Sequence, residues 1–418
     1  MRRILIALIF ILACDIVNGQ SNLMIVGGAL ESDNQPVYQK FIELAGGPKN
    51  AVIGIIPTAS GSPSSSMESF RANLIKYGMD SSRIIFIPLA MLDCESTPNI
   101  DESLWIKNAN SSEVASLIRK TTALWFTGGD QSRTIKILRN ADGSNTLALD
   151  AIYEVYKKGS VIGGTSAGAA IMSDVMITGG VSMASLKFGI SNNYIDDELK
   201  DNGALTLGKG LNFFKYGIVD QHFDKKNRLG RLVAATLLND ANYRMGFGVD
   251  ENTALVYYSK TQTIEALGAG GLTIVNSKNA ELKKNNSTLT FVNVLISHIS
   301  SGDQYNLITE EITYSTLRKP TIGNESYDIK SSVQTGIFSP NSSNFKDFVS
   351  YYLIDNKSNS QITTYCFDDE NMGLKIRFSK TAKTKGYWTD KINGRDDYSF
   401  ENIRLDITPM RLNFEEVK

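Results

Sequence analysis

Short apolar runs alternate with amphipathic stretches through the first half of this 418-residue chain, and this alternation constrains its fold most strongly. Glycine or proline, residues that end strands, occurs within two residues after each apolar run. The runs are residues 23–26, 51–56, 84–87, 123–126 and 160–162. The stretches between them have helical periodicity: 36–44, 66–77, 111–119 and 146–156. Strand–helix alternation predicts a doubly wound, mostly parallel α/β sheet flanked by helices, with ligands at the carboxyl ends of its strands.

The pattern changes after about residue 253. Short strand-like runs then follow one another with tight connections, at 254–258, 263–267, 272–276 and 289–296. They predict antiparallel strands. From residue 300 the chain is rich in Ser, Thr, Asn and Tyr, with weaker strand patterns. We therefore expect a leader (1–19), an α/β domain (20–299) and an accessory β-rich region (300–418).

The N-terminus has the composition of an export signal. Arg2 and Arg3 precede the apolar run 4–13, which is too short to span a bilayer, and small residues before Gln20 offer a cleavage site. The expectation is a secreted or periplasmic protein without a membrane anchor in its mature form. Lipidation of Cys14 is the alternative. Because export permits disulfides, Cys94 and Cys366 either pair or remain two buried thiols.

The charge balance limits the partners. The chain has 43 basic and 44 acidic side chains, a formal net charge of −1. Nucleic-acid binding would need a basic excess, so it is not expected. No metal or organic cofactor is indicated either, and the sequence leaves a homodimer open.

The strongest chemical signal is a bend between a predicted strand and a helix. Residues 164–168 read Gly-Thr-Ser-Ala-Gly and follow the run 160–162. This is a nucleophile elbow, in which small neighbours let a strained serine stand at a helix N-terminus. Ser166 is the candidate nucleophile, and the N–H groups of Ala167 and Gly129 are candidate oxyanion donors. A glycine-rich turn that only packs helix on strand is the alternative.

A serine nucleophile needs a base, and the chain has only two histidines. His222 follows an apolar strand at the point where the sequence turns polar, which favours a site. His298 lies inside an apolar strand, in step with Val292, Val294 and Ile296. We therefore expect His298 in the core and His222 as the base.

Four motifs, in order along the chain, resemble the cyanophycinase family. They are Phe-Thr-Gly-Gly-Asp-Gln (126–131), Gly-Gly-Thr-Ser-Ala-Gly-Ala (163–169), Asp-Gln-His-Phe (220–223) followed by Arg-Leu-Gly-Arg-Leu (228–232), and Gly-Val-Asp-Glu-Asn-Thr-Ala (248–254). This family consists of serine peptidases related to dipeptidase E, on a fold similar to class I glutamine amidotransferases. The resemblance covers roughly residues 23–275 and does not reach 300–418.

The resemblance implies an activity and a set of binding residues. Cyanophycin is a polyaspartate backbone that carries arginine on each side-chain carboxyl, and the family releases β-aspartyl-arginine from it. Ser166 and His222 would be catalytic. The implied substrate pocket consists of Gln131, Asp220, Gln221, Lys226, Arg228, Arg231 and Glu251. Arginines there suit the carboxylates of the polymer, and Glu251 suits its guanidinium groups.

Two departures from the family pattern stand out. Lys226 occupies a position where the family usually has arginine, so the planar fork is lost there. The acid that orients the histidine is expected some fifteen to twenty residues after the serine, but residues 178–186 contain no carboxylate. The next acids are Asp196, Asp197 and Glu198 in the following loop, and of these Glu198 is our candidate for the orienting acid.

Three other functions remain open. The peptidase could act on other isoaspartyl or acidic peptides. A secreted esterase would order its triad as Ser166, Asp250 and His298. Without an acid for its histidine, the chain could be a catalytically impaired binding homologue.

Overall fold

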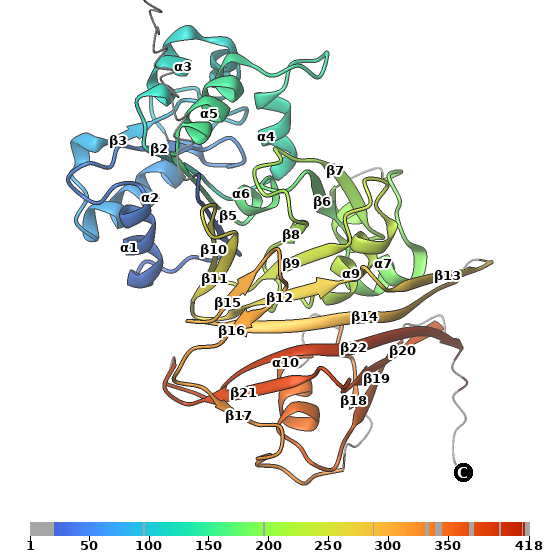
Figure 1. Cartoon of the computed structure of the whole chain (residues 1–418). Coiled ribbons are helices and arrows are strands. Elements are labelled where there is room, and N and C mark those ends of the chain that lie inside the picture. Colours follow the sequence, from blue (N-terminus) through green and yellow to red (C-terminus); the bar gives the residue numbers. More distant parts are fainter. Residues whose placement is uncertain are drawn as a thin grey trace, which may run out of the picture.

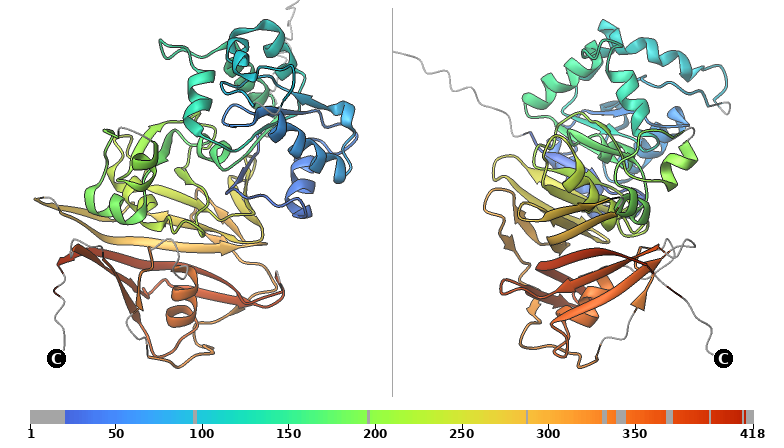
Figure 2. Two further views of the ribbon diagram at one scale, coloured as in Figure 1. Left: turned by 180° about the vertical axis from the view of Figure 1, so that it is seen from behind. Right: turned by 90° about the vertical axis from the view of Figure 1, so that its right-hand side faces the viewer.

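The computed structural model describes residues 21–94, 97–194, 197–286, 288–330, 334–338, 345–367, 372–392, 394–411 and 413. The predicted leader, with Cys14, lies outside the described residues. The N-terminal α/β part and the C-terminal strands form successive layers, with the long strand β14 (Thr288–Ser300) between them (Figures 1 and 2).

Parallel strands form the centre of the first sheet. In sheet order they are β1 (Leu23–Val26), β5 (Val161–Thr165), β4 (Ala123–Phe126), β2 (Ile53–Ile56) and β3 (Ile84–Phe86). Antiparallel strands extend the sheet beyond β1, namely β10 (Thr253–Tyr258), β11 (Thr263–Gly268), β15 (Gln304–Asn306) and β16 (Ile312–Thr313). The central strands are apolar along their whole length because both faces of the sheet are covered.

Helices cover the two faces of this sheet. On one face, α1 (Gln35–Leu44) and α2 (Pro63–Lys76) pack around Trp125, whose ring stacks on Phe70 with a centroid distance of 4.3 Å. On the other face lie α3 (Ser112–Arg119) and α5 (Leu147–Lys157). Further helical segments lie near the strand ends: η1 (Ser81–Arg83), η2 (Glu102–Asn110), α4 (Gln131–Leu138) and α6 (Ala167–Ala170).

The second sheet joins the two parts of the chain. It begins with the parallel pair β8 (Ile218–Asp220) and β9 (Met245–Val249) and continues antiparallel through β12 (Gly271–Asn276) and β14. A hairpin strand, β13 (Glu281–Asn285), also pairs with β14. The helices α7 (Ser182–Phe188) and α9 (Leu229–Leu238) belong to its hydrophobic core. The strands β6 (Val175–Gly179) and β7 (Thr206–Lys209) form a separate antiparallel pair, and the chain between them contains the short helix α8 (Asp197–Asn202).

The C-terminal strands continue this second sheet. β22 (Asp397–Arg411) pairs with β14, and after it come β20 (Met372–Ser379), β19 (Gln361–Phe367) and β18 (Gln334–Thr335). The strand β21 (Lys385–Thr389) pairs with β22, and the short strand β17 (Lys319–Pro320) pairs with β21. The helix α10 (Phe345–Val349) and the π-helical turn η3 (Ser350–Ile354) pack against these strands.

The predicted fold class is confirmed: a parallel α/β core flanked by helices is followed by a β-rich C-terminal part. That part is not a detached appendage, because its strands extend both sheets of the N-terminal part. Cys94 and Cys366 do not form a disulfide with each other. Within the described ranges, none of the helices has the length and apolar character needed to cross a membrane.

Candidate active site

Ser166 occupies the bend between β5 and α6. Its backbone has φ 55° and ψ −113°, a conformation that a residue with a Cβ rarely adopts and that costs of order 1–3 kcal/mol. The flanking glycines make the bend possible. A Cβ at Gly164 would lie 2.5 Å from the carbonyl oxygen of Gly168, and a Cβ at Gly168 would lie 2.4 Å from that of Phe126. The strand–turn–helix context predicted for Ser166 is therefore present.

His222 reaches Ser166 from the loop after β8. Its Nε2 lies 2.8 Å from the Ser166 Oγ, and its backbone N–H donates to the Gly27 carbonyl at 2.6 Å. The imidazole lies against Gly28, where a Cβ would fall 2.2 Å from the His222 Cε1. Only glycine at position 28 leaves room for the ring to approach the serine.

Glu251 completes a chain of three side chains. Its Oε1 lies 2.6 Å from the His222 Nδ1, and its backbone N–H donates to the Asp224 Oδ1 at 3.0 Å. Burial lowers the pKa of His222 below its usual value, while the Glu251 carboxylate acts in the opposite direction. The ring is therefore neutral near pH 7 and able to accept a proton.

This position of Glu251 differs from the expectation that it binds substrate. Glu198, the candidate for the orienting acid, is not the hydrogen-bond partner of His222. It lies on α8 and lines the cavity that contains Ser166 and His222. The sequence contained a usable signal. Residues 222 and 251 follow β8 and β9, which pair in parallel, so both loops emerge at the same edge of the sheet.

His298 lies elsewhere and has a different environment. It is buried on β14, where its Nδ1 is 3.1 Å from the Thr273 Oγ1. Burial lowers its pKa well below the usual value. Asp250 is likewise buried and lies 3.5 Å from the Lys346 Nζ. The alternative esterase triad of Ser166, Asp250 and His298 is therefore not assembled.

The predicted oxyanion donors lie next to Ser166. Ala167 is the first residue of α6, where helical N–H groups lack partners within the helix. The Gly128–Gly129 turn lies against the serine, because a Cβ at Gly128 would be 3.4 Å from the Ser166 Cβ. Gly129 has φ 138° and lines the same cavity as Ser166. Oxyanion binding by Ala167 and Gly129 stays a prediction.

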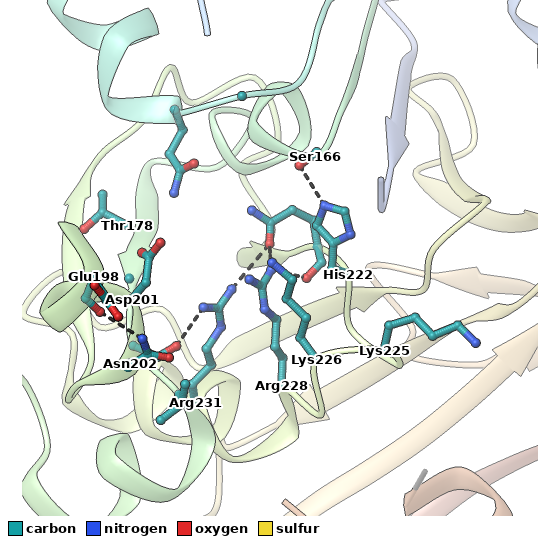
Figure 3. A pocket seen from close by; sticks show the side chains of 16 residues that line it. Ser166, Thr178, Glu198, Asp201, Asn202, His222, Lys225, Lys226, Arg228 and Arg231 are labelled. Carbon is teal, nitrogen blue, oxygen red and sulfur yellow. Dashed lines mark hydrogen bonds between the residues drawn. The ribbon is translucent and has the colours of Figure 1, made fainter. Parts of the chain in front are cut away.

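Ser166 and His222 open into a cavity of about 560 Å³. Charges of opposite sign line it. Glu198 and Asp201 come from α8 and lie on one side, while Lys226 and Arg228 lie across from them (Figure 3). The sequence analysis did not include Asp201, although it lies in the acidic segment that contains Glu198.

Two predicted binding residues, Asp220 and Arg231, neutralise each other beneath this cavity. The Arg231 Nε donates to the Asp220 Oδ2 at 2.8 Å and its Nη2 to the Oδ1 at 2.5 Å. The Arg231 Nη1 also donates to the Gly180 carbonyl at 2.8 Å. Both side chains are almost fully buried. This bidentate pair joins β8 to α9, and its charge is already compensated before any ligand binds.

Arg228 and Gln221 form a second internal contact. The Arg228 Nη1 donates to the backbone carbonyl of Gln221 at 2.5 Å and also to its side-chain Oε1. Burial, and to a smaller extent repulsion from Arg231, lowers the pKa of Arg228 to about 9. Gln131 is also engaged, since its Nε2 donates to the Ile177 carbonyl at 3.0 Å. Lys226 also lines the cavity and is exposed, so it is more accessible to a ligand than Arg228.

A strained serine, a histidine and a carboxylate in hydrogen-bonded sequence, on an α/β scaffold, define a serine hydrolase. The comparisons with known proteins narrow this class. The chain belongs to peptidase family S51, whose family model matches residues 23–264, and it is a serine-type peptidase.

Two curated relatives of the chain are cyanophycinases. A cyanophycinase of Geminocystis herdmanii (strain PCC 6308) is 28% identical over 299 residues, which cover 70% of this chain and 96% of that protein. A cyanophycinase of Trichormus variabilis (strain ATCC 29413 / PCC 7937) is 29% identical, covering 68% of this chain and 85% of that protein. Among solved structures, a peptidase from an acI-B1 actinobacterium is 22% identical with a TM-score of 0.46, covering 69% of this chain and 98% of that chain.

Proposed function

We propose that this serine peptidase hydrolyses cyanophycin to β-aspartyl-arginine, with Ser166 as nucleophile, His222 as general base and Glu251 as the acid that orients the histidine. One observation carries the proposal. The Ser166–His222–Glu251 chain opens into a cavity with Lys226 and Arg228 on one side and carboxylates on the other. The curated relatives named cyanophycinase support the same substrate.

The geometry supports a two-step acyl transfer. In the tautomer whose Nδ1–H donates to Glu251, the His222 Nε2 accepts the proton of Ser166 as the Oγ attacks the scissile carbonyl. The Glu251 carboxylate stabilises the imidazolium that forms. His222 then gives this proton to the leaving amine, and water hydrolyses the acyl-enzyme with the histidine again as base. N–H groups of Ala167 and Gly129 would receive the oxyanion.

The substrate has the charges that the cavity complements. Each unit of cyanophycin carries a guanidinium group, which suits Glu198 and Asp201. The free α-carboxylate of the same arginine suits Lys226, since Arg231 is already paired with Asp220. Binding of both charges would place a terminal aspartyl-arginine unit next to Ser166.

The test is release of β-aspartyl-arginine from insoluble cyanophycin by the purified chain, measured by mass spectrometry. We expect Ser166→Ala to abolish release and Ser112→Ala, at an exposed serine on α3, to leave it unchanged. Equal release by both variants would refute the role of Ser166.

Other isoaspartyl peptides are a second candidate, favoured by Lys226 in place of arginine and by the internal pairing of Arg231. A panel of α- and β-aspartyl dipeptides, assayed beside cyanophycin, distinguishes the two candidate substrates. A kcat/KM higher for a dipeptide without arginine than for cyanophycin segments would favour the second candidate. The impaired-homologue hypothesis loses its main support, because Glu251 supplies the carboxylate that the sequence analysis did not find.

Export remains part of the proposal and is supported by the composition of residues 1–19. Expression with the native N-terminus, followed by N-terminal sequencing of the extracellular or periplasmic protein, tests it. Cleavage before Gln20 supports simple secretion, whereas a lipid on Cys14 supports anchoring.

A further inference from the structure

A second polar cavity, of about 470 Å³, adjoins the active site. Lys225 lines both cavities. Its neighbour Asp224 lines the second cavity and also accepts the backbone N–H of Glu251. The second cavity therefore lies directly behind the loop that holds the His222–Glu251 pair.

Both halves of the chain build this cavity. Asp224, Lys225 and His298 come from the N-terminal part, while α10, η3 and residues 395–398 supply the remaining wall. The C-terminal contributors lie beyond residue 264, where the match to the peptidase family model ends. The cavity is thus a feature that the C-terminal part adds to the peptidase.

Two deeply buried polar side chains in its wall have unused hydrogen-bonding capacity. His298 and Ser350 are each only 1% exposed. Among the described residues, neither the His298 Nε2 nor the Ser350 Oγ has a hydrogen-bond partner. Buried polar groups are normally partnered, so such a pair in a cavity wall indicates a place for a polar ligand.

The charges around the cavity are mixed. Lys346 reaches the buried Asp250, with 3.5 Å between the Lys346 Nζ and the Asp250 Oδ2. Asp347 and Arg395 are exposed on the rim, and Lys225 lies on the side that faces the active site. Carboxylates suit a guanidinium group, and cations suit a carboxylate. The rim therefore matches a ligand that carries both.

We propose that this cavity is a second binding site for an aspartyl-arginine unit, placed so that Lys225 lies between it and the catalytic cavity. This inference rests on the proposed function for the identity of the ligand. The unit has two sources, a further segment of the polymer being cleaved or the dipeptide already released. Both carry the same guanidinium and carboxylate groups.

The first experiment measures co-sedimentation of the full chain with insoluble cyanophycin. Ser166→Ala is the background, so that the polymer stays intact. In it, Asp347→Asn/Arg395→Gln removes one charge of each sign from the rim. The matched control is Asp328→Asn/Lys357→Gln, which removes an exposed ion pair elsewhere in the C-terminal part. We expect the rim variant to bind about 10-fold more weakly than the control.

The second experiment titrates β-aspartyl-arginine into the same two variants by calorimetry. If the rim variant binds only the dipeptide more weakly than the control does, the site takes the released product. If it binds the polymer more weakly, the site takes the substrate. Rim and control variants that bind polymer and dipeptide equally would overturn the proposal. The proposed function has a separate test. If Ser166→Ala binds the polymer but the unmodified chain does not cleave it, the proposed function is contradicted and the second site is not.

Discussion

Single residues set the geometry of the hydrogen-bonded side chains Ser166, His222 and Glu251. Gly28 shows how little space the site leaves for a change. The His222 ring occupies the place of a side chain at position 28, so this glycine is required by space as well as by its φ of 112°. His222 itself has φ 47°, a further sign that the loop is held in a conformation suited to the site.

Gly28→Ala is expected to reduce kcat by at least about 100-fold, because a displacement of the base by 1 Å or so disturbs the attack geometry. Gly47→Ala is the matched control. Gly47 also has a positive φ, of 78°, but a Cβ there meets nothing within 4 Å. Both variants bear a backbone cost of order 1–3 kcal/mol for alanine at a positive φ, measurable by urea unfolding, and only the first should lose activity. Equal activity of the two variants would show that the ring does not depend on Gly28.

Glu251→Gln tests the acid through pH dependence. The carboxylate raises the pKa of His222 against the effect of burial, so its removal lowers that pKa further. The acid limb of the kcat/KM profile should move to lower pH, and the maximum should fall by about 10³- to 10⁴-fold. Glu154→Gln, at an exposed ion pair with Arg119, is the control and should change neither. An acid limb that stays in place in Glu251→Gln would remove Glu251 from the catalytic chain.

At the scale of elements, the ends of adjacent parallel strands explain which parts of the site could be predicted. The elbow is local, since its strand, turn and helix are contiguous, and the sequence was sufficient to place Ser166. The acid is 29 residues from the histidine and depends on the pairing of β8 with β9. A search at a fixed distance after the serine therefore passed over Glu251. The internal pairing of Arg231 with Asp220 was equally inaccessible, because exposure on a helix cannot be derived from spacing alone.

Asp220→Asn should destabilise the junction of β8 and α9. The change leaves the buried Arg231 guanidinium without its carboxylate, at a cost of about 3–5 kcal/mol in the free energy of unfolding. Asp328→Asn breaks an exposed ion pair with Lys357 and should cost less than about 1 kcal/mol. Denaturant unfolding of both variants measures the difference. Similar midpoints would mean that Arg231 finds another partner.

At the scale of the whole molecule, the C-terminal part belongs to the same structure as the peptidase. The boundary expected near residue 300 was drawn from a change in composition. In the structure, β14 ends at that point; it pairs with β12 over Leu295–Ser300 and with β22 between Phe291 and His298. Phe291 and Ile296 of β14 share a hydrophobic core with Phe400 and Leu405 of β22.

Truncation after Ser300 is therefore expected to give a chain that does not fold cooperatively, rather than an independent peptidase. It would expose the hydrogen-bonding edge of β14 and the apolar side chains of this core, a combination that promotes aggregation. It would also remove Lys346 from the buried Asp250, which is next to Glu251 in the chain. Size-exclusion chromatography and thermal unfolding of the truncated and full-length chains measure the effect. A soluble truncated chain with a sharp unfolding transition and full activity would show that residues 301–418 are dispensable for the fold, and their role would then be confined to the second cavity.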